Sequence, residues 1–159
     1  MKYQVDQSGK IEDTNKDTVL AVASNDFQYT LKVPSKVKRE IQNFCREDGQ
    51  SKLFVYKTFT VCLFSLLNAY NMKISSVIID KEYPGHEGLI GEMLTNLFEI
   101  FEIGSRITFS FGLIGKESPA HTIAHDVATG RKREDKRMGA TEIKKIASYL
   151  SPDWLPVGR

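Results

Sequence analysis

Cysteine is scarce in this chain, and none of the spacings typical of redox or zinc sites occurs. The 159 residues include only Cys45 and Cys62. They form no CxxC pair and no Cys/His ligand pattern, which argues against a disulfide scaffold and against a zinc site. We expect two buried free thiols in a reducing compartment.

The sequence also lacks a long apolar run, a phosphate-binding loop and a strong charge of one sign. Its most apolar stretch, 53–70, is interrupted by Lys57 and Asn68 and falls short of the roughly 20 residues that cross a bilayer. The N-terminus has no signal-peptide pattern, so we expect a cytoplasmic protein without a membrane segment. No GxxxxGK[ST] pattern is present, which argues against binding of a nucleoside triphosphate. Lys and Arg number 22 against 20 Asp and Glu, so a basic surface must come from local clustering.

Length and hydrophobic content favour a single domain over residues 1–159. Hydrophobic residues make up 41% of the chain, enough for one sizeable core around one sheet. Segment 53–70 is expected to be a buried helix of this core, with a homodimer interface as the alternative. A basic segment, 131–137, and a last helix, 140–150, are expected to form a C-terminal extension before an irregular tail, 151–159.

Hydrophobic periodicity predicts an α/β fold with a mixed five-stranded sheet flanked by helices. Alternating patterns predict an antiparallel meander of three strands at 3–6, 18–23 and 27–33. Segment 75–80 is an unalternating β-branched run, as expected of a parallel strand buried on both faces, and 106–113 is predicted as the fifth strand. Helical spacing predicts further helices at 37–49, 89–101 and 118–128, the last with Ser118 as its cap and Pro119 in its first turn.

Three aspartates stand at distinctive places in these predicted elements. Asp6 lies in Val5-Asp6-Gln7-Ser8-Gly9, and Asp80 ends the run Val77-Ile78-Ile79-Asp80. Asp126 lies in the helical segment Ala124-His125-Asp126-Val127-Ala128. Each has a structural alternative, because acids often follow strands as turn formers and a helix acid is often simply solvated.

The order of elements, together with these acids, resembles the ribonuclease H-like superfamily of retroviral-integrase and resolvase type over roughly residues 1 to 130. That superfamily has an aspartate in its first strand, a second acid ending its fourth strand and a third on its closing helix. The resemblance therefore implies that Asp6, Asp80 and Asp126 bind Mg²⁺ or Mn²⁺. A fourth acid, frequent on the family's first helix, has no clear counterpart here. Glu82 is the favoured substitute ligand, ahead of Glu87.

Carboxylate-held cations of this kind suit the cutting of a phosphodiester bond by water, since two hard cations can stabilise the attacking and leaving oxygens. We therefore expect a nuclease acting on RNA, an RNA/DNA hybrid or structured DNA. His125 or His121 is a candidate metal ligand or proton carrier for the leaving oxygen. The alternative for each is a surface or helix-capping histidine.

The basic segment is the candidate nucleic-acid surface. Its cations are expected to contact backbone phosphates; they are Arg131, Lys132, Arg133, Lys136 and Arg137. A solvated loop of mixed charge is the alternative. Tyr83 is expected either to stack on a base or to pack on the rim of the sheet. Two other functions stay open: a non-catalytic nucleic-acid-binding or scaffold domain that retains the fold, and a hydrolase of small phosphorylated compounds.

Overall fold

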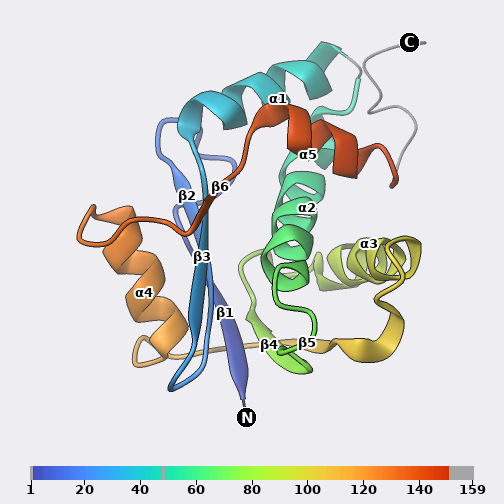
Figure 1. The fold of residues 1–159 in the computed structure, drawn as a ribbon. Coiled ribbons are helices and arrows are strands. Elements are labelled where there is room, and N and C mark those ends of the chain that lie inside the picture. The colour runs from blue at the N-terminus through green and yellow to red at the C-terminus, as the bar shows by residue number, and fades with distance from the viewer. Residues whose placement is uncertain (1, 48, 151–159) are drawn as a thin grey trace.

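The computed structural model describes residues 2–47 and 49–150, which form a mixed sheet with helices on both faces (Figure 1). The strands are β1 (Tyr3–Ser8), β2 (Thr18–Ala23), β3 (Gln28–Val33), β4 (Ser76–Asp80), β5 (Thr108–Gly112) and β6 (Lys136–Arg137). The α-helices are α1 (Ser35–Glu47), α2 (Phe54–Asn68), α3 (Glu87–Ile100), α4 (Pro119–Ala128) and α5 (Ala140–Ala147), and short 3₁₀ turns precede α2 and β5. In this part of the chain, every helix is too short or too polar to span a bilayer.

The sheet confirms the predicted α/β class and corrects the number of strands. Across the described residues the strand order is β5-β4-β1-β2-β3-β6. β1, β2 and β3 are antiparallel neighbours, whereas β4 and β5 run parallel to β1. The expected five strands are joined by a sixth, β6, inside the segment predicted as a basic extension. Two residues are too few to show a strand period, so this pairing left no pattern in the sequence.

The side chain of Asp135 fastens β6 to the edge of the sheet. Its Oδ2 accepts hydrogen bonds from the Thr30 backbone N–H at 2.8 Å and from Thr30 Oγ1 at 3.1 Å. Lys136 and Arg137 then pair in parallel with Leu31 and Lys32. The segment 131–137 is therefore partly built into the sheet and is not simply a solvated loop.

The main core lies on the face of the sheet covered by α1, α2, α3 and α5 (Figure 1). α2 is buried over most of its surface, and Phe59 and Leu63 are at most 1% exposed. This confirms that the apolar segment is a core helix. Cys45 and Cys62 are buried free thiols in the same core, as expected.

Of the described helices, only α4 covers the opposite face, where it packs on β1, β2 and β3 (Figure 1). The Ser118 side chain caps it by accepting a hydrogen bond from the Ala120 N–H at 3.2 Å, which confirms the predicted start of the helix. Its buried stripe is made of small and β-branched residues that allow a close approach to β2; they are Ala120, Ile123, Ala124 and Val127. α4 leaves the outer strands β4 and β5 uncovered, and Ser76, Thr108 and Ser110 are exposed there.

The connection between β1 and β2 is held rigidly beside the end of β1. Gly9 has a φ of +82°, and a side chain at this position would collide with the carbonyl of Asp17. The buried Lys38 ammonium donates hydrogen bonds to the Lys10 carbonyl at 3.0 Å, the Asp13 carbonyl at 2.6 Å and Thr18 Oγ1 at 2.9 Å. Burial lowers the pKa of Lys38 to about 8, although the acids nearby oppose the shift.

The C-terminal end of the chain departs slightly from its expected form. α5 ends at Ala147, three residues before the predicted end of the last helix. The predicted irregular tail, 151–159, lies outside the described residues.

Candidate metal centre

The register between β1 and β4 places Asp6 beside Asp80. Val5 is the partner of Ile79 in this parallel pair, so the residues that follow them lie side by side at the same end of the two strands. Asp6 is also opposite Ala21 in β2, and Ala21 packs under α4. Because side chains opposite one another in a sheet share a face, Asp6 lies on the α4 face.

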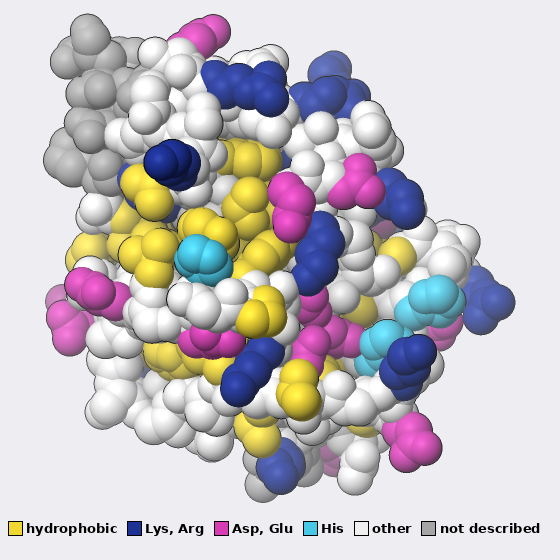
Figure 2. All heavy atoms as spheres, turned by 180° about the vertical axis from the view of Figure 1, so that it is seen from behind, with side chains coloured by type: hydrophobic (Ala, Val, Ile, Leu, Met, Phe, Trp, Pro, Cys, Tyr) yellow, Lys and Arg dark blue, Asp and Glu magenta, His cyan; other side chains and the backbone are white. Residues whose placement is uncertain are grey.

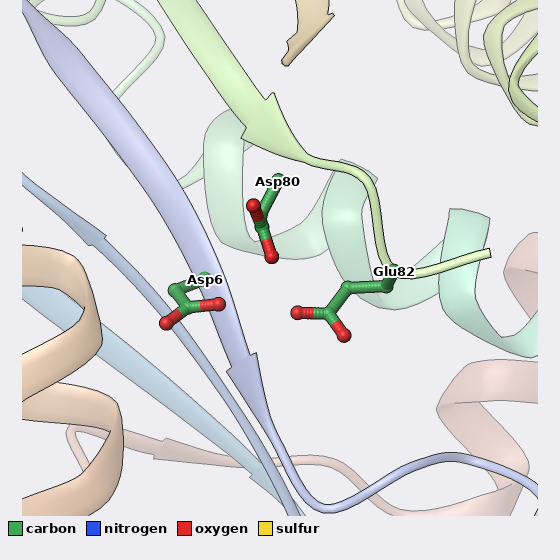
Figure 3. A group of neighbouring side chains, drawn as sticks. All are labelled: Asp6, Asp80 and Glu82. Atoms are coloured by element: carbon green, nitrogen blue, oxygen red, sulfur yellow. The ribbon is translucent and has the colours of Figure 1, made fainter. Parts of the chain in front are cut away.

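A tight turn after β4 brings a third carboxylate to these two. The Glu82 N–H donates to the Asp80 carbonyl at 2.9 Å, which turns the chain back toward the site. Asp6, Asp80 and Glu82 each offer an oxygen, and these oxygens lie within 4.8 Å of one another (Figure 3). We call these three residues the acid cluster. Asp6 is buried, whereas Asp80 and Glu82 keep partial access to solvent.

Each carboxylate of the acid cluster is oriented by a further contact. Asp6 Oδ1 accepts from the Gln7 N–H at 2.9 Å, and Asp80 Oδ1 accepts from the Ile114 N–H at 3.0 Å. Glu82 Oε2 lies 3.2 Å from the Lys10 ammonium. The oxygens are thus held in place without being surrounded by cations.

The pKa of Glu82 reflects its burial first and the negative charge beside it second. Burial raises the pKa to about 8, Lys10 opposes the shift, and Asp6 adds to it. The proximity of Asp6 disfavours a second negative charge at Glu82. A bound divalent cation would relieve this repulsion, and carboxylate oxygens are the ligands that Mg²⁺ and Mn²⁺ prefer.

His121 joins the acid cluster from α4. Its Nδ1 lies 2.7 Å from Asp6 Oδ2. An ionised carboxylate only accepts hydrogen bonds, so Nδ1 carries the proton and Nε2 is the ring nitrogen left for other chemistry. The side chain is 40% exposed. His125, one helical turn further on, is exposed on the same flank of α4. Figure 2 shows histidine side chains at the surface of the molecule, some of them close to acidic and basic side chains.

Asp126 is not brought into the acid cluster, although it was predicted as a ligand. Five residues along an α-helix correspond to a rotation of about 140°, so Asp126 lies on the other flank of α4 from His121. Its carboxylate instead lies 3.8 Å from Arg131. The sequence identified the helix but selected the wrong position on it for contact with Asp6. Glu82, the predicted substitute ligand, does belong to the acid cluster, whereas Glu87 accepts a hydrogen bond from the Gly85 N–H.

The cations of the predicted basic surface differ in whether an acidic side chain lies beside them. Lys136 forms an ion pair with Glu142 at 2.8 Å, and Arg137 pairs with Glu134 at 2.9 Å. Arg131 lies near Asp126, as noted. Lys132 and Arg133 are exposed, and within residues 2–47 and 49–150 no acidic side chain pairs with either.

Tyr83 packs in the core and is unavailable for stacking on a base. It is 7% exposed, and its hydroxyl accepts hydrogen bonds from Gln7 Nε2 and the Ile11 N–H, both at 3.1 Å. Of the two expected roles, the packing role is therefore the one observed.

Sequence reasoning missed Lys10, whose only signal was its position four residues after Asp6 in the turn that follows β1.

Comparison with protein-family models, with curated proteins and with solved structures gave no match. The function is therefore argued from the geometry of the acid cluster and its surroundings.

Proposed function

We propose that the protein is a divalent-metal-dependent nuclease that hydrolyses phosphodiester bonds. The observation that carries this proposal is the convergence of Asp6, Asp80 and Glu82, with oxygens within 4.8 Å of one another. When bound there, Mg²⁺ or Mn²⁺ would stabilise the negative charge that gathers on the attacking and leaving oxygens. Asp6 and Asp80 on adjacent strands and Glu82 on the following turn are the residues that would hold it.

The remaining chemistry is assigned to water and His121. The water oxygen forms a bond to phosphorus, and the bond from phosphorus to the leaving oxygen breaks with its electron pair on that oxygen. Water gives its proton to solvent. His121 Nε2, in its protonated form, gives a proton to the leaving oxygen and regains one from solvent. Asp6 favours this role because it accepts from Nδ1 at 2.7 Å and thereby stabilises the positively charged ring.

The arrangement of the sheet supports a ribonuclease H-like fold. The antiparallel β1, β2 and β3 are followed by the parallel β4 and β5, with β1 central between β2 and β4. Asp6 lies within β1 and Asp80 ends β4, as in that superfamily, and α4 brings a side chain to them. His121 would here take the place that an acid has in the family. β6 is an addition to the five-stranded pattern.

A polymeric substrate is favoured over a small phosphorylated compound. Asp80 and Glu82 are partly exposed at the end of strands that α4 leaves uncovered. The described cavities of about 410, 540 and 290 Å³ lie elsewhere, lined for example by Phe98, Met72 and Pro119. A site that is open to its surroundings suits a long strand, whereas small ligands are usually enclosed. Lys132 and Arg133 are the exposed cations that would contact its phosphates.

The test is Asp6→Asn, with Asp126→Asn as the matched control. Each change removes one carboxylate charge and keeps the shape of the side chain. With Mg²⁺ and a panel of labelled RNA, hybrid and branched DNA, we expect Asp6→Asn to abolish cleavage and Asp126→Asn to retain it. Cleavage by Asp6→Asn at the wild-type rate would contradict the proposal. Binding without cleavage by the wild-type protein would favour a non-catalytic nucleic-acid-binding domain.

A further inference from the structure

We propose that Lys10 is a catalytic residue of this nuclease, whose ammonium donates a hydrogen bond to a non-bridging oxygen of the scissile phosphate. The inference rests on the proposed function and adds to it a residue that contacts the substrate. It is carried by the position of Lys10, which reaches Glu82 of the acid cluster from the turn that follows β1.

The Lys10 side chain contacts the acid cluster at Glu82 and is half exposed to solvent. Its Nζ donates to the Glu82 carbonyl at 2.7 Å and to Glu82 Oε2 at 3.2 Å. It also lies 5.0 Å from the centre of the Tyr83 ring, and the side chain is 49% exposed. An ammonium group has three N–H donors. Two of them are directed to Glu82, and the third has no acceptor among the described residues, so it can serve a phosphate oxygen.

The backbone beneath Lys10 is fixed more firmly than a surface ion pair requires. The buried Lys38 ammonium holds the carbonyl of Lys10 itself at 3.0 Å. Gly9, the preceding residue, accepts a hydrogen bond from Thr18 Oγ1 at 3.0 Å and packs against the backbone of Asp17. A lysine anchored on a rigid turn loses little further freedom when it meets a ligand. This preorganisation is what a group that stabilises a transition state needs.

Lys10 keeps its proton throughout the proposed reaction. In hydrolysis the phosphorus gains a bond to the water oxygen and loses its bond to the leaving oxygen, and charge spreads over the non-bridging oxygens. Lys10 acts on that charge by donating a charged hydrogen bond. While Glu82 binds a cation, the contact from Nζ to the Glu82 carbonyl oxygen can persist, because that oxygen belongs to the backbone.

The competing explanation is that Lys10 only neutralises Glu82. Both explanations expect Lys10→Met to bind Mn²⁺ at least as tightly as the wild-type protein, because a positive charge beside the ligands is lost. They differ in the cleavage rate at saturating Mn²⁺ and substrate. A simple ion pair has no effect on that rate, whereas a phosphate contact does.

The experiment compares Lys10→Met, Lys10→Arg and the control Lys16→Met, which removes an exposed lysine from the same connection. Mn²⁺ affinity is measured by calorimetry on the full chain, and single-turnover cleavage of a labelled oligonucleotide is measured at saturating Mn²⁺. We expect Lys10→Met to bind Mn²⁺ undiminished yet cleave about a hundredfold or more slowly, as when one donor to a developing oxyanion is lost. Lys10→Arg should recover most of the rate, and Lys16→Met should match the wild type.

Two results would overturn the inference, and they differ from each other. If the wild type binds Mn²⁺ and cleaves, and Lys10→Met cleaves equally fast, Lys10 does not contact the phosphate although the nuclease proposal stands. If the wild type neither binds Mn²⁺ nor cleaves, the proposed function fails and the role of Lys10 fails with it.

Discussion

Two glutamates of this protein expose similar fractions of their side chains to solvent but lie in opposite electrostatic settings. The side chain of Glu82 is 12% exposed and that of Glu134 is 9% exposed. Glu134 lies 2.9 Å from Arg137 and 3.9 Å from Lys32. Among the described residues, Glu82 pairs with one cation, Lys10, and shares its surroundings with two further carboxylates.

The pKa values of the two glutamates shift in opposite directions. Burial raises the pKa of Glu134, but hydrogen bonds from its own backbone N–H and from Arg137, together with the charge of Lys32, outweigh burial and lower it. At Glu82, burial and Asp6 outweigh Lys10 and raise the pKa to about 8. A carboxylate matched by cations stabilises the fold, whereas one held beside other carboxylates is a candidate ligand for a cation from outside.

The largest expected difference between the two glutamates is in cleavage. Glu82→Gln removes a proposed ligand, and we expect Mg²⁺-dependent cleavage to fall by about a hundredfold or more, since even residues that only support a metal's ligands contribute about 10–100-fold. Glu134→Gln should cleave at the wild-type rate. Single-turnover rates at saturating Mg²⁺ provide the measurement, and equal losses in both variants would remove the distinction between the two sites.

For stability, the two variants should rank in the opposite order, with Glu134→Gln losing more than Glu82→Gln. Glu134→Gln weakens the hydrogen bonds from Arg137 and the attraction to Lys32, and we expect a loss of about 1–2 kcal/mol in the free energy of unfolding. Glu82→Gln removes a charge that is repelled by Asp6, so without metal at pH 8 it should be no less stable than the wild type. Urea unfolding in the presence of EDTA measures both. A clear loss of stability in Glu82→Gln would show that its pairing with Lys10 dominates.

The contributions of Glu82 and Glu134 to stability should also depend on pH with opposite sign. Because the pKa of folded Glu82 is raised from 4.5 to about 8, its contribution is fully present below about 4.5 and is lost as the pH rises through 8. The pKa of Glu134 is lowered, so its contribution is present above 4.5 and is lost on acidification below that value. Without metal, the stability of the wild type relative to Glu82→Gln should therefore decline between pH 5 and pH 8. A flat difference across this range would contradict the raised pKa.

The smallest expected effect concerns the basic segment. Replacing Lys132 and Arg133 by Ser should lower the slope of log affinity against log salt by about 0.9 for each lost phosphate contact on B-form DNA. The matched pair, Lys136→Ser with Arg137→Ser, removes cations already paired with Glu142 and Glu134 and should leave the slope unchanged. If the two double variants behave alike, intramolecular ion pairs do not decide which cations contact nucleic acid.

Much of the fold could be predicted from the sequence because it rests on local periodicity. The strands at 18–23 and 75–80, the buried helix around Phe59 and the cap at Ser118 all depend on residues close together in the chain. β6 could not be predicted in this way, since two residues pair with β3 through the Asp135 contact to Thr30. That contact joins residues that are 105 positions apart.

The acid cluster was only partly predictable for a related reason. Asp6 follows from an acid within the first predicted strand, Asp80 from a strand that ends in an acid, and Glu82 from its position two residues further on. Which residue of α4 reaches Asp6 depends on the rotation of the helix about its axis. This rotation is set by the packing of Ile123 and Val127 on β2. This rotation brings His121 to Asp6 and turns Asp126 away. The position of Lys10 beside Glu82 depends on the turn that Lys38 holds in place. No short sequence motif indicates this turn.

The central claim is that Asp6, Asp80 and Glu82 together bind a divalent cation. Anomalous scattering from a crystal of the full chain soaked in Mn²⁺ tests it most directly. We expect an anomalous-difference peak for Mn²⁺ at bonding distance, about 2.0–2.6 Å, from carboxylate oxygens of all three residues. An Asp6→Asn crystal soaked in the same way should have no such peak at this place. A wild-type crystal at saturating Mn²⁺ with no peak among these carboxylates, or with the ion bound at Asp126 instead, would contradict it.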